Sequence, residues 1–174
     1  AAGYSRGESG GIACKALSGA KRDNVILATK VHGTMGDYPN QSGNSRRWII
    51  KEVENSLRRL GTDWIDLYQI HRPEADTDID ETLAALTDLV RAGKVRYIGS
   101  STFPASQIVS AQWTAEKRGR ERFVCEQPPY SLLVREIEKD VLPTARSYGM
   151  GVMPWSPRAG GGLELGGATD GEQS

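Results

Sequence analysis

Three residues of this chain could together deliver a proton to a substrate oxygen. Lys30 and His71 each follow an apolar run typical of a β-strand, and Tyr4 lies near the start of the sequence. A tyrosine hydroxyl has a reference pKa of about 10. A nearby ammonium group favours the phenolate, so it brings that pKa toward the working pH. An imidazole can then hydrogen-bond a carbonyl oxygen or relay the proton.

Each of these residues also has a plainer interpretation. A lysine at the end of a strand is often a solvated rim residue, and a lone histidine is more often structural than catalytic. A tyrosine near the end of a chain often has no special role. The hypothesis of a proton donor therefore depends on elements that bring the three side chains to one place.

The elements that would do so are five apolar runs, each ended by polar residues. They span residues 25–29, 64–70, 95–99, 123–126 and 151–154. Helical patterns lie between them, and this alternation is typical of βα units and a parallel sheet. In a parallel barrel the carboxyl ends of all strands meet at one face, where the active site is built. We therefore predict an α/β fold with five to six βα units of a (β/α)8 TIM barrel.

The connecting segments are predicted from caps and apolar periodicity. Ser45 is a good N-cap for a helix that Gly61 ends. A helical pattern over residues 137–148 contains Pro143, so this helix is expected to begin late or to bend. Residues 32–44 form a long polar loop on the face where ligands are usually covered.

Composition excludes several other classes of protein. The 174 residues carry 22 basic and 22 acidic side chains, so nothing indicates a nucleic-acid partner or an anionic membrane. No run approaches the roughly 18 apolar residues of a membrane span. Cys14 and Cys125 have no metal-binding spacing, so no metal site and a disulfide-free cytoplasmic protein are expected. We expect one domain over residues 1–162 and a Gly-rich tail without regular structure over residues 163–174.

Several stretches, in the same order and spacing, make the chain resemble the aldo-keto reductases from residue 1 to about residue 162. The resembling stretches are residues 26–30, 55–61, 66–71, 93–101, 126–127 and 155–157. The resemblance implies a (β/α)8 barrel, shortened at both ends in this chain. It also implies hydride transfer between NADP(H) and a small-molecule carbonyl or alcohol.

Catalytic residues follow from the resemblance one by one. Tyr4 matches the tyrosine acid, Lys30 matches the lysine that ends the next strand, and His71 matches the histidine after the following one. The family's catalytic aspartate falls before Ala1, so it has no counterpart in this sequence. Without that aspartate the lysine loses its carboxylate partner.

The resemblance also assigns residues that hold the nicotinamide. Ser101 and Gln127 match the serine and glutamine that bind its carboxamide, and Thr102 stands where the family usually has asparagine. Trp155 stands where an aromatic ring stacks against the nicotinamide, although a core tryptophan is an equally good interpretation without the resemblance.

The loop after the last apolar run is a candidate for phosphate binding. Ser156, Arg158 and Gly160 lie in it, and the resemblance makes the preceding run the seventh barrel strand. Barrel phosphate sites favour the loops after strands seven and eight. A flexible Gly-rich end is the plainer interpretation. The basic segment that grips the 2′-phosphate in the family has no counterpart here, so NADP over NAD rests on the resemblance alone.

Two further polar residues lie near the strand ends. His32, in the loop after Lys30, is expected to be solvated. Arg72 could line the mouth of the pocket or pair with Asp76, and the pairing is the preferred interpretation.

Three functions remain open at this point. The first is NADPH-dependent reduction of aldehydes or ketones to alcohols. The second is a catalytically incomplete fragment, or a regulatory subunit that binds cofactor without turnover. The third, a metal-dependent barrel enzyme, is disfavoured because the chain has only two histidines. The sequence indicates neither the oligomeric state nor the particular carbonyl substrate.

Overall fold

The computed structural model of the chain describes residues 8–16, 19–159 and 162. Its elements are α1 Glu8–Ala16, η2 Gly19–Asn24, β1 Ala28–Val31, α2 Arg46–Leu60, β2 Ile65–Ile70, α3 Ile79–Arg91, β3 Val95–Ser101, α4 Ala105–Arg118, β4 Cys125–Gln127, η3 Glu136–Glu138, α5 Val141–Ser147 and β5 Gly151–Val152. Tyr4, Gly160 and the tail over residues 163–174 lie outside the described residues. The domain limits therefore stay predictions.

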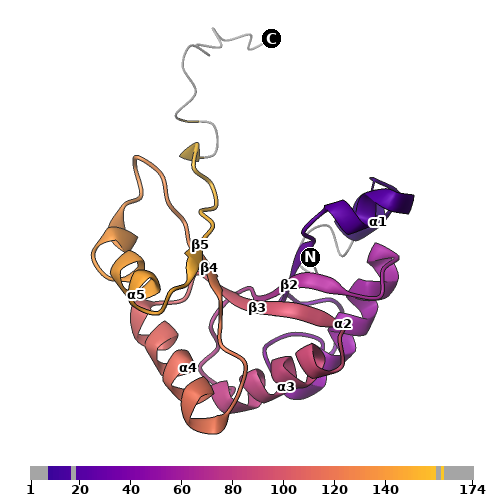
Figure 1. Cartoon of the computed structure of the whole chain (residues 1–174), viewed down its shortest axis with the longest axis horizontal. Helices are drawn as coiled ribbons and strands as arrows, with labels where there is room; N and C mark the ends of the chain where they lie inside the picture. The colour runs from indigo at the N-terminus through magenta and orange to yellow at the C-terminus, as the bar shows by residue number, and fades with distance from the viewer. Residues whose placement is uncertain (1–7, 17–18, 160–161, 163–174) are drawn as a thin grey trace, which may run out of the picture.

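One parallel sheet organises the described part of the chain. Its strands follow the order β1-β2-β3-β4-β5, and every neighbouring pair is parallel. Helices α2 to α5 form an arc along the outer side of the curved sheet (Figure 1). The predicted alternation of strands and helices is therefore confirmed, and it is the pattern of a partial (β/α)8 barrel.

The hydrophobic core lies between the sheet and this arc of helices. Each helix buries one apolar stripe, because residues three and four apart share a helix face. Ile49 and Val53 of α2, Leu83 of α3 and Ile108 of α4 are all fully buried. The other face of the sheet carries no helix layer among the described elements, and Tyr97 of β3 is 60% exposed. The two sides of one strand thus have different environments.

Strand boundaries differ from the apolar runs by a few residues. The first strand begins at Ala28 rather than Val25, so it contains Lys30. The third strand continues through Ser101. Ladder partners decide where a strand ends: Lys30 pairs with Gln69 and Ser101 pairs with Gln127. Apolar content alone does not reveal those partners.

Helix ends follow the predicted capping chemistry. The Ser45 side chain accepts a hydrogen bond from the Trp48 N–H, and Gly61 ends α2 in the left-handed conformation at φ 62°. The pattern over residues 137–148 divides into η3 and a shorter α5 that begins at Val141. Pro143 then lies in the first turn, where its missing N–H costs no helical hydrogen bond.

None of the helices in the described ranges is long and apolar enough to cross a membrane.

Candidate active site

A cavity of about 120 Å³ opens at the carboxyl ends of the strands. It is lined by Lys30, His71, Arg72, Ser101, Gln127 and Trp155. Five of these six residues were predicted as site residues, and they span 126 positions of the sequence from Lys30 to Trp155. The structure therefore brings together side chains that the parallel topology was expected to gather.

Sheet register explains how the strands present these side chains. Lys30 pairs with Gln69, and Gln69 pairs with Gly99, so these residues form one row across the sheet. Ser101 and Gln127 pair with each other two residues further along their strands. Because side chains two residues apart point to the same face, both rows face the same side of the sheet. The pocket is built from successive rows of one face.

The Lys30 ammonium is electrostatically unusual. Burial lowers its pKa, the Arg72 guanidinium lowers it further, and Cys125 opposes the shift. No carboxylate of the described residues lies within ion-pair distance of its Nζ atom. Lys30 is therefore a partly buried ammonium group beside a second cation, a setting more typical of functional sites than of structural salt bridges.

The His71 imidazole is held neutral near pH 7. Its pKa is lowered from 6.5 to about 4, mostly by burial and further by the nearby charges of Arg72, Lys30 and His32. A neutral imidazole has one N–H donor and one acceptor. His71 can therefore donate a hydrogen bond to a carbonyl oxygen at neutral pH without carrying a charge.

Arg72 is a pocket residue, and the expected pairing with Asp76 is wrong. Its Nη1 donates to Thr102 Oγ1 at 3.0 Å and to the His71 carbonyl oxygen at 2.7 Å. Its guanidinium also lies over the Trp155 ring, 5.9 Å from the centroid. These three contacts hold the guanidinium over the strand ends, so it cannot reach back toward the acidic loop.

The polar end of β3 has fixed hydrogen-bond directions. Ser101 Oγ donates to the Gln127 carbonyl oxygen at 2.9 Å. Thr102, the next residue, has a left-handed backbone at φ 59° and accepts from Trp155 Nε1 at 3.3 Å. A β-branched residue rarely adopts this conformation, and such strain is often found at functional sites. Thr102 thus lies directly beside the pocket that it was predicted to join.

Two predicted residues of the phosphate loop lie apart from this cavity. Ser156 and Arg158 are exposed and are not among its lining residues. Ser156 has a left-handed backbone at φ 55°, which turns the chain directly after Trp155. Tyr4 and Gly160 lie outside the described residues, so their roles stay predictions.

A buried carboxylate supports β3 and β4 from behind the pocket. Glu126 is fully buried and accepts hydrogen bonds from the Ser100 hydroxyl and from the Phe103 N–H, the latter at 3.1 Å. Burial raises its pKa, while both hydrogen bonds and Arg72 oppose the shift. Glu126 therefore positions the strand ends rather than facing the cavity.

A second network ties the loop after β1 to the loop after β2. Asn44 Oδ1 lies 3.0 Å from His32 Nδ1, Asn44 Nδ2 donates to the Arg72 carbonyl oxygen at 3.0 Å, and the Asn44 N–H donates to Glu74 Oε2 at 2.7 Å. Thr77 Oγ1 donates to the same Glu74 oxygen at 2.5 Å. The prediction that His32 is simply solvated is wrong, because it belongs to this network.

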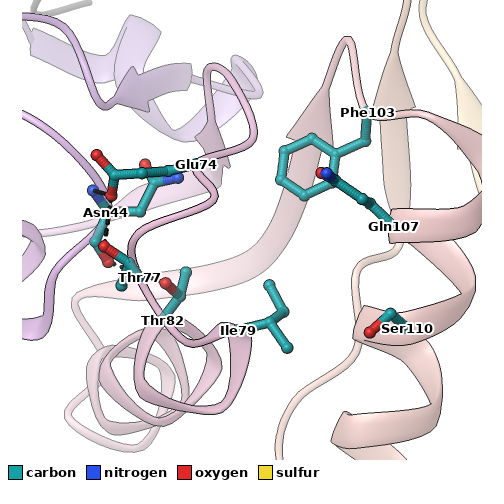
Figure 2. Close-up of a pocket in the computed structure, with 8 residues that line it drawn as sticks. All are labelled: Asn44, Glu74, Thr77, Ile79, Thr82, Phe103, Gln107 and Ser110. Carbon is teal, nitrogen blue, oxygen red and sulfur yellow. Dashed lines mark hydrogen bonds between the residues drawn. The ribbon is translucent and has the colours of Figure 1, made fainter.

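The same network forms one wall of a smaller cavity of about 80 Å³ between the starts of α3 and α4. Figure 2 shows Glu74 and Thr77 beside Asn44 on one side, with Phe103 and Gln107 on the other. None of the predicted site residues lines this cavity. It lies behind the loops that carry Arg72 and Thr102 rather than at the strand ends.

Sequence reasoning missed Asn44 and underrated Arg72. Asn44 lies in a polar loop without a recognisable motif, and its partners are 12 to 38 positions away. Arg72 did carry a usable signal, because it directly follows His71 at the end of a predicted strand. A residue directly after a strand of a parallel barrel lies at the face where the active site is built, and the nearby Asp76 does not change this.

A parallel α/β sheet with a polar pocket at its carboxyl edge places this protein in the (β/α)8-barrel class. The sequence matches the aldo/keto reductase family over residues 1–173, and the chain belongs to that family. It is 48% identical to an uncharacterized oxidoreductase, YrpG, of Bacillus subtilis, over 84% of this chain and 46% of the relative. It is 40% identical to the aldo-keto reductase dtxS3 of Metarhizium robertsii, over 92% of this chain and 50% of the relative.

The chain spans about half the length of the curated relatives that it matches. The resemblance noted in the sequence is thus confirmed at the level of family and fold.

Proposed function

We propose that this chain forms part of an NADPH-dependent reductase that converts small aldehydes or ketones to alcohols. One observation carries the proposal most directly: Lys30 and His71, predicted from separate strands, line one pocket with Ser101, Gln127 and Trp155. Membership of the aldo/keto reductase family supports the same reaction class.

The residues present suit a nicotinamide. Ser101 and Gln127 offer hydroxyl and amide groups, and Trp155 is 38% exposed, so part of its ring can stack on a flat ligand. When bound, the cofactor supplies the hydride that goes to the carbonyl carbon. Preference for NADP(H) over NAD(H) is proposed on the family resemblance, since the residues in the pocket do not distinguish the two.

We assign proton delivery to Tyr4, Lys30 and His71. We assign Tyr4 as the acid that protonates the substrate oxygen as the alcohol forms. Lys30 lowers the pKa of Tyr4, because an ammonium group stabilises the phenolate. His71, neutral at pH 7, donates a hydrogen bond to the same oxygen and orients the carbonyl. The free Cys14 and Cys125 suit a reducing compartment such as the cytoplasm.

A second candidate is a chain that binds the cofactor without turnover. It is favoured by the absence, among the described residues, of a carboxylate that pairs with Lys30. Such a carboxylate would complete the tuning of the tyrosine in the family's catalytic set.

Thermal unfolding with saturating NADPH, followed by reduction of an aromatic aldehyde, tests both candidates. A ligand at a hundredfold excess over its Kd stabilises the native state by about 2.7 kcal/mol. Stabilisation together with turnover supports the reductase, and stabilisation without turnover supports the second candidate. No cooperative transition and no stabilisation would contradict both.

Lys30→Met separates the two candidates further. The reductase predicts a loss of turnover of about 100-fold or more, typical of proton-transfer catalysis, with NADPH binding retained. Lys139→Met is the matched control, since Lys139 is exposed and does not line the pocket. Equal turnover of the two variants would contradict the role of Lys30.

A further inference from the structure

Arg72 keeps part of its hydrogen-bonding capacity unused at the pocket. A guanidinium group carries N–H donors on Nε, Nη1 and Nη2 in a fixed planar fork. Nη1 uses both of its hydrogens, one on the His71 carbonyl oxygen at 2.7 Å and one on Thr102 Oγ1 at 3.0 Å. In the part of the chain that the structure describes, Nε and Nη2 have no hydrogen-bond acceptor. These donors are therefore available to a ligand.

The pocket also carries an excess of positive charge. Lys30 and Arg72 both line it, and none of its lining residues is an acid. Neither cation forms an ion pair with a carboxylate of the described residues. Two like charges without a counterion repel each other, so an anion that enters the pocket is attracted by both.

The buried Glu126 does not neutralise this charge for a ligand. Its carboxylate accepts from the Ser100 hydroxyl and from the Phe103 N–H, and it is not among the lining residues. Glu126 is fully buried, whereas Arg72 is partly exposed. A ligand in the pocket therefore meets the guanidinium and not the carboxylate.

The remaining donors of Arg72 also define the shape of the anion. Nε–H and one Nη2–H lie side by side in the guanidinium plane, a spacing that matches the two oxygens of a carboxylate. The bonds to Thr102 and to the His71 carbonyl oxygen, with the Trp155 ring 5.9 Å away, hold the guanidinium in place. A side chain that is already held loses little entropy when it binds.

We propose that Arg72 binds the carboxylate of an acidic carbonyl substrate, so the pocket reduces aldehyde acids or keto acids. This inference rests on the proposed function, in which His71 donates to the carbonyl oxygen. Because Arg72 directly follows His71, the two residues recognise two groups of one ligand. The hydride goes from the nicotinamide to the carbonyl carbon and the proton goes from Tyr4 to the oxygen, so the carboxylate is unchanged by the reaction.

A phosphate of the cofactor would use the same donors of Arg72. The cavity that Arg72 lines also contains Ser101, Gln127 and Trp155, which are assigned to the nicotinamide. A ribose separates the nicotinamide ring from the nearest phosphate of the cofactor. The substrate carboxylate is therefore the favoured occupant, and the experiment below distinguishes the two anions.

Matched acids and esters isolate the contribution of the carboxylate. The acids 3- and 4-carboxybenzaldehyde carry it at two distances from the aldehyde, and their methyl esters replace it by a neutral group. Calorimetry on the full chain saturated with NADP⁺ gives the dissociation constants without turnover. We expect at least one acid to bind about 10- to 100-fold more tightly than its ester, as for a charged hydrogen-bonded pair. Added salt should weaken the acid and leave the ester unchanged.

Arg72→Met removes the guanidinium, and Arg72→Lys keeps the charge without the planar fork. The preference for the acid should vanish in Arg72→Met and be reduced in Arg72→Lys. The ratio of the two dissociation constants stays informative if Arg72→Met also disturbs Thr102, because that disturbance acts on both ligands. Arg47→Met is the matched control and should keep the wild-type ratio, since Arg47 is exposed and does not line the pocket. If Arg72→Met does not fold, Arg72→Lys provides the comparison.

The proposal is overturned if the wild type binds neither acid more tightly than its ester, or if Arg72→Met keeps the preference. It is also overturned if Arg72→Met weakens NADP⁺ by about 10-fold or more and leaves the ratio unchanged, because Arg72 then binds a cofactor phosphate. The proposed function fails in a different way. An acid that binds with the expected preference and is not reduced by NADPH would contradict the reductase and support the role of Arg72. A chain that does not bind NADP⁺ would overturn both.

Discussion

Arg72 bends back onto the residue before it, and its Nη1 donates to the His71 carbonyl oxygen at 2.7 Å. The guanidinium is thereby held at the pocket that both residues line. It disfavours a second positive charge there, and it contributes to the lowered pKa values of His71 and Lys30. One permanent cation thus adds to the lowering of both pKa values that burial begins.

Replacing Arg72 should change the titration of His71. Burial is the largest cause of the lowered His71 pKa and Arg72 is the next, so Arg72→Met should move this pKa from about 4 part of the way toward 6.5. The unfolded chain binds more protons than the folded chain between these values, so the stability contributed by His71 falls as the pH drops through this window. NMR titration of the imidazole C–H signals measures the pKa directly. An unchanged value would contradict the electrostatic role of Arg72.

A side chain at Gly99 should disturb the sheet beneath the pocket. A Cβ on Gly99 would lie 2.8 Å from the Cys125 carbonyl oxygen, a backbone atom of the neighbouring strand. Gly99→Ala should therefore destabilise the fold by about 1–3 kcal/mol and weaken NADPH binding through Ser101. Gly151→Ala is the matched control, because its nearest contact, Val124 O, would be 3.8 Å away. Urea unfolding compares the two, and equal costs would contradict the close approach of the strands.

Gly43, the residue before Asn44, should tolerate a side chain poorly. Gly43 has φ 88°, and a Cβ there would lie 2.6 Å from Glu74 Oε1. Gly119→Ala meets only the left-handed backbone, at φ 63° with nothing within 4 Å, and should cost about 1–2 kcal/mol. Gly43→Ala should cost more than this control in urea unfolding, because it must also displace the Glu74 carboxylate. A smaller cost would mean that the Glu74 network is not rigid.

Glu126 gives the chain a pH dependence of opposite sign to that of His71. Burial raises the pKa of Glu126 above 4.5, so the folded state holds its proton more tightly than the unfolded chain does. The stability from this group is present at low pH and falls as the pH rises through the raised pKa. Glu126→Gln should remove that slope, so the variant should gain on the wild type as the pH rises above about 4.5. Urea unfolding gives the free energy of unfolding of both proteins as a function of pH. If the difference between them does not change with pH, the raised pKa is contradicted.

The sequence predicted the order and direction of the strands because their apolar runs alternate regularly with helical patterns. It placed Lys30 just after a strand rather than inside one, since the ladder partner Gln69 cannot be read from local composition. Pro143 correctly predicted a late helix start. A proline inside a helical pattern must lie in a first turn or break the helix, and α5 begins at Val141.

The site was predictable where residues lie at strand ends and less so where loops meet. Lys30, His71, Ser101 and Gln127 lie on or directly after strands, so topology alone gathers them at the pocket. The contact between Arg72 and Thr102 depends on the side-chain conformations of two connections 30 positions apart, and no local pattern encodes it. The roles of Tyr4 and Gly160 remain predictions.

The neighbouring residues Ser100 and Ser101 link the native register of β3 and β4 to the formation of the pocket. Ser100 meets the buried Glu126 carboxylate behind the sheet, whereas Ser101 faces the pocket. A pairing of β3 and β4 shifted by one residue would exchange their faces. It would take the Ser100 hydroxyl from a buried carboxylate and remove Ser101 from the pocket in the same event. A chain with this shifted register would be less stable and would also fail to bind its ligand. Molecules that are well folded but inactive because of shifted strands should therefore not accumulate.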